Sequence, residues 1–121
     1  MKVKNIRWTS ITAQEAEVEI TDGEHTCTVF SQPCEVNIGE NLSDPLHIFD
    51  IKNVRINEEL PLGIASNRNH TLKRKIVGEV IDTENQVISV GQLRFIVDDY
   101  LPGGLQAGDH IEFDCERIDL W

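Results

Sequence analysis

The chain has 121 residues, which suits one domain of ordinary size, and 40% of them are apolar and 26% charged. This balance excludes a disordered tail, and no apolar run approaches the roughly 20 residues needed to span a bilayer. The 21 acidic residues exceed the 11 basic ones and leave a formal charge of −10, which opposes binding to phosphate backbones and anionic lipid and favours basic partners.

The N-terminal part of the chain reads as strands joined by short turns. Residues 2–11 predict a first strand of imperfect period, and residues 15–20 alternate between acidic and apolar side chains. Asp22-Gly23 predicts a two-residue type I′ hairpin, because both residues tolerate the positive φ that this turn requires. We expect the return strand over residues 25–30.

The middle of the chain continues this pattern with two irregularities. Pro33 predicts a bend, after which residues 34–39 alternate again and predict a short strand. Residues 46–56 predict a longer strand, and its change of phase indicates a β-bulge near Lys52-Asn53. Residues 57–69 have no apolar period and predict either a crossover or an exposed loop.

The last part of the chain contains the clearest strands. Residues 72–81 and 87–90 predict two strands, and two alternating runs between residues 92 and 120 flank turns at Pro102-Gly103-Gly104 and Gly108-Asp109. No segment shows apolar residues at helical spacing with caps, so we expect little or no helix. The fold class is therefore all-β: a small antiparallel barrel or sandwich, OB-like or SH3-like, in a single domain over residues 1–121.

A repeat is an alternative description of the same pattern. Residues 20–36 and 81–97 superpose at an offset of 61, which would divide the chain into halves 1–57 and 70–121 joined by loop 58–69. Any two β segments share a period of two, so chance similarity competes with duplication.

Two rows of carboxylates are the leading candidate for a binding surface. Each row occupies alternate positions of one strand, and like charges aligned in this way require compensation. One reading is internal pairing, with Lys2 and Lys4 beside the first row and Lys73 and Lys75 beside the second; the other is a docking face for a basic partner. The partner-binding candidates are Glu15, Glu17, Glu19, Glu112, Asp114 and Glu116.

Other site chemistries have weaker signals. Three cysteines cannot all pair within one chain, so buried thiols are expected; His25, Cys27 and Cys34 are weak metal candidates because their spacing does not match a zinc site. The chain contains no phosphate-binding, nucleophile-elbow or metalloprotease motif, so we expect no catalytic residues and no cofactor. The basic cluster that would serve a nucleic-acid module consists of Arg68, Lys73, Arg74 and Lys75.

These observations predict a non-catalytic acidic protein-binding module, of the immunity-protein or inhibitor type, that docks on a basic protein such as a nuclease or toxin. The alternatives are a small OB-like or SH3-like module for nucleic acid or another ligand, and a structural subunit that forms a homodimer through exposed strand edges. Residues 1–8 lack the apolar core of a secretory signal, so we expect a cytoplasmic protein with no membrane contact.

Overall fold

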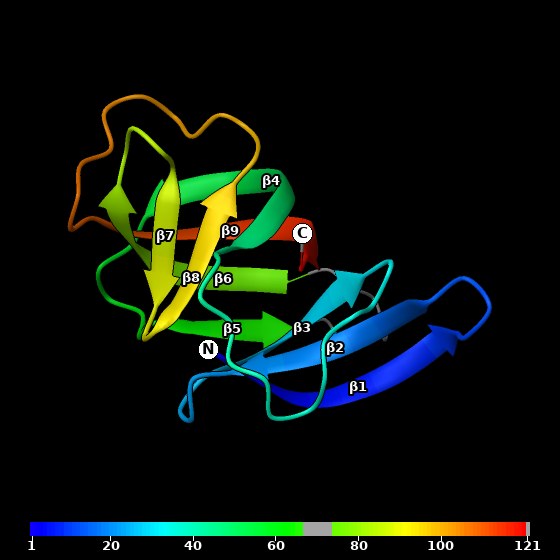
Figure 1. The fold of residues 1–121 in the computed structure, drawn as a ribbon. Coiled ribbons are helices and arrows are strands. Elements are labelled where there is room, and N and C mark those ends of the chain that lie inside the picture. The colour runs from blue at the N-terminus through cyan, green and yellow to red at the C-terminus, as the bar shows by residue number, and fades with distance from the viewer. Residues whose placement is uncertain (67–73, 121) are drawn as a thin grey trace.

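The computed structural model describes residues 1–66 and 74–120, and all regular secondary structure within them is β-strand (Figure 1). None of these residues lies in a helix, so no described helix could cross a membrane. The strands are β1 (Lys2–Ser10), β2 (Glu15–Thr21), β3 (Thr26–Ser31), β4 (Leu46–Ile56), β5 (Gly63–Ser66), β6 (Arg74–Asp82), β7 (Val87–Val90), β8 (Leu93–Val97) and β9 (His110–Asp119).

Five of the strands close into a barrel. β6, β7 and β8 form an antiparallel meander, and β8 pairs in parallel with β4. β4 pairs antiparallel with β9, and β9 returns to pair antiparallel with β6, which completes the ring. The expected small all-β barrel is confirmed, and closure removes the free edges that an open sheet of these strands would have.

The remaining N-terminal strands form an arm that extends from the barrel. β1, β2 and β3 make an antiparallel sheet, visible in blue and cyan in Figure 1. β3 meets β9 through one parallel bridge, Phe30 to Asp119, and the Leu120 N–H donates to the Phe30 carbonyl at 2.9 Å. The sheet is therefore continuous from the arm into the barrel.

A second contact joins the arm to the barrel at the opposite end of β3. The Asp22 carboxylate accepts from the Gln92 N–H at 2.8 Å, which ties the β2–β3 turn to the β7–β8 turn. Gly91 precedes this donor with φ +59°, and a Cβ there would lie 2.6 Å from Asp22 Oδ2. Only glycine fits this position, because a side chain would be strained and would also displace Asp22.

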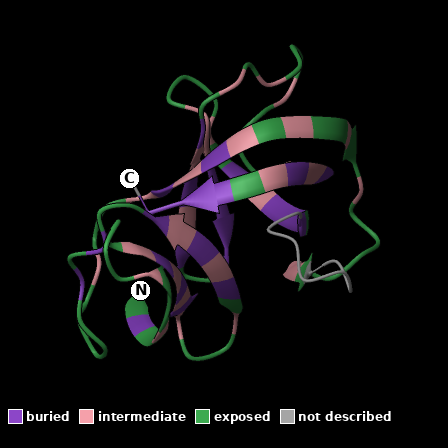
Figure 2. Ribbon diagram, turned by 90° about the vertical axis from the view of Figure 1, so that its right-hand side faces the viewer, coloured by how far each residue is buried: buried purple, intermediate pink, exposed green. Residues whose placement is uncertain are grey.

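One hydrophobic core runs through both parts of the molecule. Figure 2 shows the buried residues concentrated where the strands cross, with exposed loops around them. The strict alternation of β2 buries Ala16, Val18 and Ile20, and these pack in the same cluster as barrel residues such as Phe95 and Phe113. Period-2 patterning thus placed the core face of β2, β3 and β8 correctly.

The expected β4 is confirmed with its bulge, since the pairing with β9 shifts register between Lys52 and Arg55.

Two local predictions are wrong. The β2–β3 connection is a four-residue loop, because the Asp22 carboxylate accepts from the N–H groups of Glu24 and His25 and favours that wider turn.

Residues 34–39 do not form a strand. The Cys34 N–H donates to the Gln14 carbonyl at 2.7 Å and the Gly39 N–H to the Val3 carbonyl at 2.8 Å, so no regular ladder forms along the segment. Its apolar pattern has a different cause: Cys34 and Val36 are buried and cover the open side of the arm's core. The segment after residue 57 also contains a short strand, β5, that its sequence did not indicate.

The repeat stays a prediction. Its two proposed halves share one sheet, because β4 of the first half lies between β9 and β8 of the second.

Candidate functional site

The carboxylates of β9 lie between two strands that supply cations. Glu112 stands opposite Arg55 of β4 and Val77 of β6, and its side chain is only 1% exposed. The Arg55 guanidinium donates to Glu112 Oε1, and the Lys75 ammonium lies 3.7 Å from Oε2. A docking face requires exposed carboxylates, whereas Glu112 is buried.

The rest of this row is also compensated. Asp114 accepts from the Asn53 side-chain amide at 2.8 Å, and Glu116 lies 3.6 Å from the Lys52 ammonium. Both partners come from β4, at or beside its bulge. These contacts correspond to the internal-pairing reading, with Lys75 as one of the cations named for it. The other, Lys73, lies outside the described residues.

The first row, on β2, is half-buried and only partly compensated. Glu17 pairs with Arg7 of β1, and Glu15 accepts from the Thr9 hydroxyl at 2.8 Å. The cation is thus Arg7 rather than the expected Lys2 or Lys4. Register explains the difference, because Lys2 stands opposite Thr21 and the ladder is irregular between Val3 and Asn5.

A third group of carboxylates was not predicted from the sequence as a docking surface. The β6–β7 turn and the segment that follows β8 lie together at one end of the barrel. The Gln86 side chain joins them: its Nε2 donates to the carbonyls of Val97 and Asp99, both at 2.7 Å, and its Oε1 accepts from the Leu101 N–H at 2.9 Å. Segments distant in sequence therefore share one surface.

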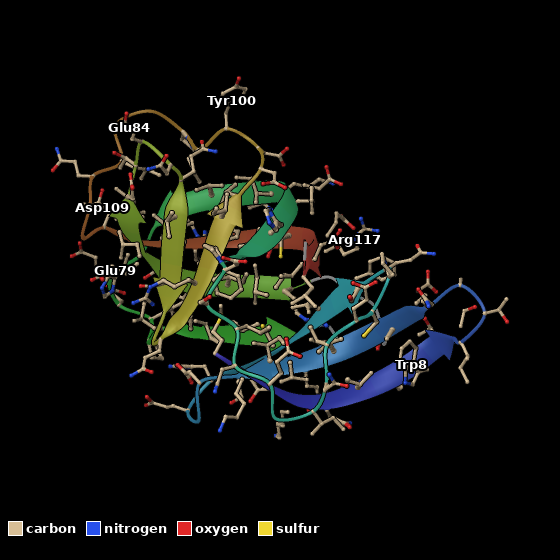
Figure 3. All side chains as sticks on the ribbon, in the orientation of Figure 1. Trp8, Glu79, Glu84, Tyr100, Asp109 and Arg117 are labelled. Carbon is tan, nitrogen blue, oxygen red and sulfur yellow. The ribbon has the colours of Figure 1, made fainter. Side chains whose placement is uncertain are left out.

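This surface is strongly acidic. Residues 79–86 and 98–110 contain six carboxylates and no lysine or arginine. Figure 3 labels Glu79, Glu84 and Asp109 on this side of the molecule. We call the group the acidic end; its members are Glu79, Asp82, Glu84, Asp98, Asp99 and Asp109.

The contacts of the acidic end satisfy hydrogen bonds without neutralising charge. Asp82 accepts from the Asn85 side chain at 2.8 Å, which lowers the pKa of Asp82 below its ordinary value. Asp99 accepts from the Ile51 N–H and Asp109 from the Gln106 N–H. The amide donor of Asn85 thus favours the ionised form of Asp82.

Two histidines supply the cationic contacts that the described structure shows at the acidic end. His110 lies 3.6 Å from Glu79, and His47 lies 3.4 Å from Asp98. Each carries a charge only when protonated, so compensation there is weaker than at β9, where lysine and arginine are charged throughout the physiological range.

An exposed aromatic side chain accompanies these charges. Tyr100 directly follows Asp98-Asp99, is 95% exposed and projects from the barrel in Figure 3. Ile81, on β6 beside the same turn, is also exposed. The sequence signal for this surface was the long absence of lysine and arginine, but only the fold shows that the two segments meet.

The described part of the nucleic-acid cluster is not an exposed basic patch. Arg74 is buried opposite Cys115, and Lys75 pairs with Glu112. Arg68 and Lys73 lie outside the described residues, so the structure does not place the rest of this cluster.

The candidate metal ligands are divided between a turn and the core. His25 is in the β2–β3 loop, whereas Cys27 and Cys34 are buried free thiols, as is Cys115. Burial raises the pKa of Cys27 to about 12, so the thiolate that binds metal is disfavoured. Across residues 1–66 and 74–120, no three histidine, cysteine or acidic side chains are grouped to hold a metal ion.

Comparisons of the chain with protein-family models, with curated proteins and with solved structures found no match.

Proposed function

We propose that the protein is a non-catalytic binding module that docks on a basic protein through its acidic end. The observation that carries the proposal is the collection of six carboxylates on two segments that contain no lysine or arginine and that Gln86 joins, together with the exposed Tyr100 in the second segment. A negative surface of this kind accelerates encounter with a positive one and penalises acidic partners.

Tyr100 would add an apolar contact area and a hydroxyl group that the carboxylates do not provide. Tyrosine is enriched among the residues that dominate interface energies, since its ring buries a large area and its hydroxyl finds a hydrogen-bond partner. An almost fully exposed tyrosine directly after Asp98-Asp99 is therefore a suitable anchor. The carboxylates of the acidic end would lie at the rim of the interface, where their charge guides association.

This proposal moves the docking surface away from the β9 carboxylates. Glu112, Asp114 and Glu116 already have partners within the protein, so a basic protein would have to displace Arg55, Lys75 and Lys52. The β2 row is a weaker candidate because Glu17 is paired with Arg7. The partner that suits the acidic end is a basic protein such as a nuclease or toxin, which an immunity protein or inhibitor would neutralise. A cytoplasmic location accompanies this proposal as a prediction.

The homodimer remains a separate prediction. From Asn5 to Ser10, the outer edge of β1 carries no strand pairing in the described structure. The pairing of β1 with β2 shifts register at Lys4 and at Thr9, and Arg7 lies between these two bulges. Bulges and charged side chains on an edge strand disfavour edge-to-edge association.

The test compares two variants of equal charge. Glu84→Lys/Asp98→Lys reverses two exposed carboxylates of the acidic end, and Glu24→Lys/Glu58→Lys reverses two exposed carboxylates elsewhere. Each tagged protein is incubated with extract of the native host, eluted stepwise with salt and analysed by mass spectrometry. We expect one stoichiometric basic protein that wild type and control retain and that the acidic-end variant binds about tenfold more weakly, as loss of charge complementarity implies.

The proposed surface is wrong if both variants retain the protein equally. The proposed function is wrong if wild type retains no basic protein at low salt. Tyr100→Ala distinguishes an anchor from a purely electrostatic contact: an anchor predicts faster dissociation at unchanged salt dependence.

A further inference from the structure

The Gln86 side chain holds the backbone on both sides of Tyr100. Its Nε2 donates to the carbonyls of Val97 and Asp99, both at 2.7 Å, and its Oε1 accepts from the Leu101 N–H at 2.9 Å. The Gln86 carbonyl also accepts from the Val97 N–H at 3.1 Å. A single neutral side chain therefore uses both its donors and its acceptor on the segment that carries the exposed ring.

The residues before Tyr100 are also bound to β4. The Asp98 N–H donates to the Ile48 carbonyl at 3.0 Å, and Asp99 Oδ2 accepts from the Ile51 N–H at 3.2 Å. The segment thus has hydrogen bonds to the β6–β7 turn and to β4, and its backbone is fixed before any partner arrives.

The residue after Tyr100 is restricted in two further ways. The Leu101 side chain packs against the hydrophobic core, and Pro102 follows it in the chain. A residue that precedes proline is limited to extended backbone angles. Asp99 and Leu101 are consequently half-buried, whereas Tyr100 between them is 95% exposed and projects from the barrel in Figure 3.

This arrangement has consequences for binding. A loop that becomes ordered in a complex loses backbone entropy, and a loop whose backbone is already fixed avoids that loss. A flat partner surface would meet the projecting ring first and would stay away from the half-buried Asp99. Contact with the ring and with its neighbours therefore requires a hollow on the partner that receives the ring.

We propose that Gln86 is a positioning residue, which holds Tyr100 as a preformed projection that enters a pocket on the basic partner. The inference rests on the proposed function and adds the shape of the partner surface: an apolar pocket for a phenol ring, with basic groups at its rim. Gln86 carries no charge, so its effect is separate from that of the carboxylates.

The first test uses the protein alone. Gln86→Met keeps the length and the neutrality of the side chain but removes the amide. In ¹⁵N relaxation measurements, we expect order parameters of about 0.85 for residues 98–101 in wild type and below about 0.6 in Gln86→Met. Gln92→Met is the matched control, because it changes an exposed glutamine at the opposite end of the β7–β8 hairpin, and it should leave these values unchanged.

A second variant serves if Gln86→Met does not fold. Gln86 adopts φ +56°, which asparagine tolerates well, so Gln86→Asn keeps the turn while withdrawing the amide by one methylene. The same fall in order parameters is expected. Order parameters in residues 98–101 that equal those of wild type in the folded variant would overturn the proposal, whatever the partner is.

The second test is a double-mutant cycle on the basic protein that wild type retains from host extract, purified and immobilised. We expect Gln86→Met to raise the Kd about tenfold, as loss of preorganisation implies. In a Tyr100→Ala background the same change should alter the Kd less than about twofold, because Gln86 acts through the ring.

The cycle separates positioning from a general structural role. Equal effects of Gln86→Met with and without the Tyr100 ring, or wild-type affinity in Gln86→Met, would overturn the proposal. If wild type retains no basic protein, the proposed function is wrong and this inference falls with it.

Discussion

The acidic end and the β9 row contain the same kind of side chain under opposite conditions. On β9, Glu112 and Glu116 lie beside Arg55, Lys75 and Lys52, which β4 and β6 bring from both sides. At the acidic end, the carboxylates meet backbone N–H groups, Asn85 and two histidines. One region is neutralised within the fold, and the other presents its charge to solvent.

The difference shows that strand alternation identifies a charged face without revealing whether it is free. Charge compensation in a sheet depends on the strands to either side, since cross-strand neighbours decide whether a carboxylate meets a cation. β9 lies between two strands with basic residues. The acidic end is built from the last residues of β6 and from turns, and these segments contain no lysine or arginine.

The largest expected effect concerns the buried member of the β9 row. Arg55→Ala leaves the buried Glu112 with only the more distant Lys75 as a cationic neighbour. We expect the free energy of unfolding to fall by about 2 kcal/mol. This is less than the roughly 3–5 kcal/mol lost when a buried charge keeps no partner at all. Glu112→Gln should cost less, about 1 kcal/mol, because both cations are exposed and regain water.

Urea unfolding of the two variants measures this order. A larger loss for Glu112→Gln than for Arg55→Ala would show that the arginine does not compensate the buried charge and would remove the contrast between the two regions.

The next prediction concerns Asp22, a carboxylate that accepts hydrogen bonds from backbone N–H groups instead of pairing with a lysine or arginine. Partial burial raises its pKa, but backbone donors from His25, Gln92 and Glu24 outweigh this effect and lower the pKa of Asp22 below its ordinary value. Asp22→Ala removes the bond to the β7–β8 turn as well as the local loop, and we expect about 1–2 kcal/mol less stability.

The pH dependence of Asp22 has a definite sign. Because its pKa is lower in the folded state, the stabilisation is present above the ordinary carboxyl pKa and is lost as the pH falls through the folded pKa. Wild type should therefore lose stability toward acid more steeply than Asp22→Asn in urea titrations between about pH 5 and pH 2. Parallel curves for the two proteins would exclude this role.

The smallest effect belongs to the acidic end itself. Glu84→Gln removes one exposed charge from a group of like charges, so stability should stay within about 0.5 kcal/mol of wild type and should not fall. Any gain should disappear at high salt, because salt screens repulsion between exposed carboxylates. Thermal unfolding at low and high salt provides the comparison. A clear loss of stability would mean that Glu84 has a compensating partner and that the acidic end is not free.

Much of the barrel followed from local patterns. In the barrel, β8 was located from period-2 alternation, as β2 was in the arm, and the phase change near Lys52 indicated the β4 bulge correctly. The residues after Pro33 were predicted wrongly because Cys34 and Val36 are buried without a strand partner. Burial, rather than pairing, generated their alternation.

The candidate site was harder to predict from the sequence, because it depends on contacts between residues that are far apart along the chain. That Glu112 is buried follows from Arg55, which is 57 residues away, and from the β6 strand on its other side. The acidic end depends on Gln86, which joins the β6–β7 turn to the segment after β8. Neither of these contacts can be recognised from the residues that are adjacent in the sequence.

The most direct test of the central contrast is a titration of ¹⁵N-labelled protein with tetralysine, a basic probe that reports where negative charge is free. We predict that amide shifts concentrate in residues 79–86 and 98–110, that Tyr100 is among the residues affected, and that about 0.5 M salt abolishes them. Shifts centred on Glu112–Glu116 or on Glu15–Glu19 would contradict the account, since they would show that the strand carboxylates, and not the acidic end, are open to a basic partner.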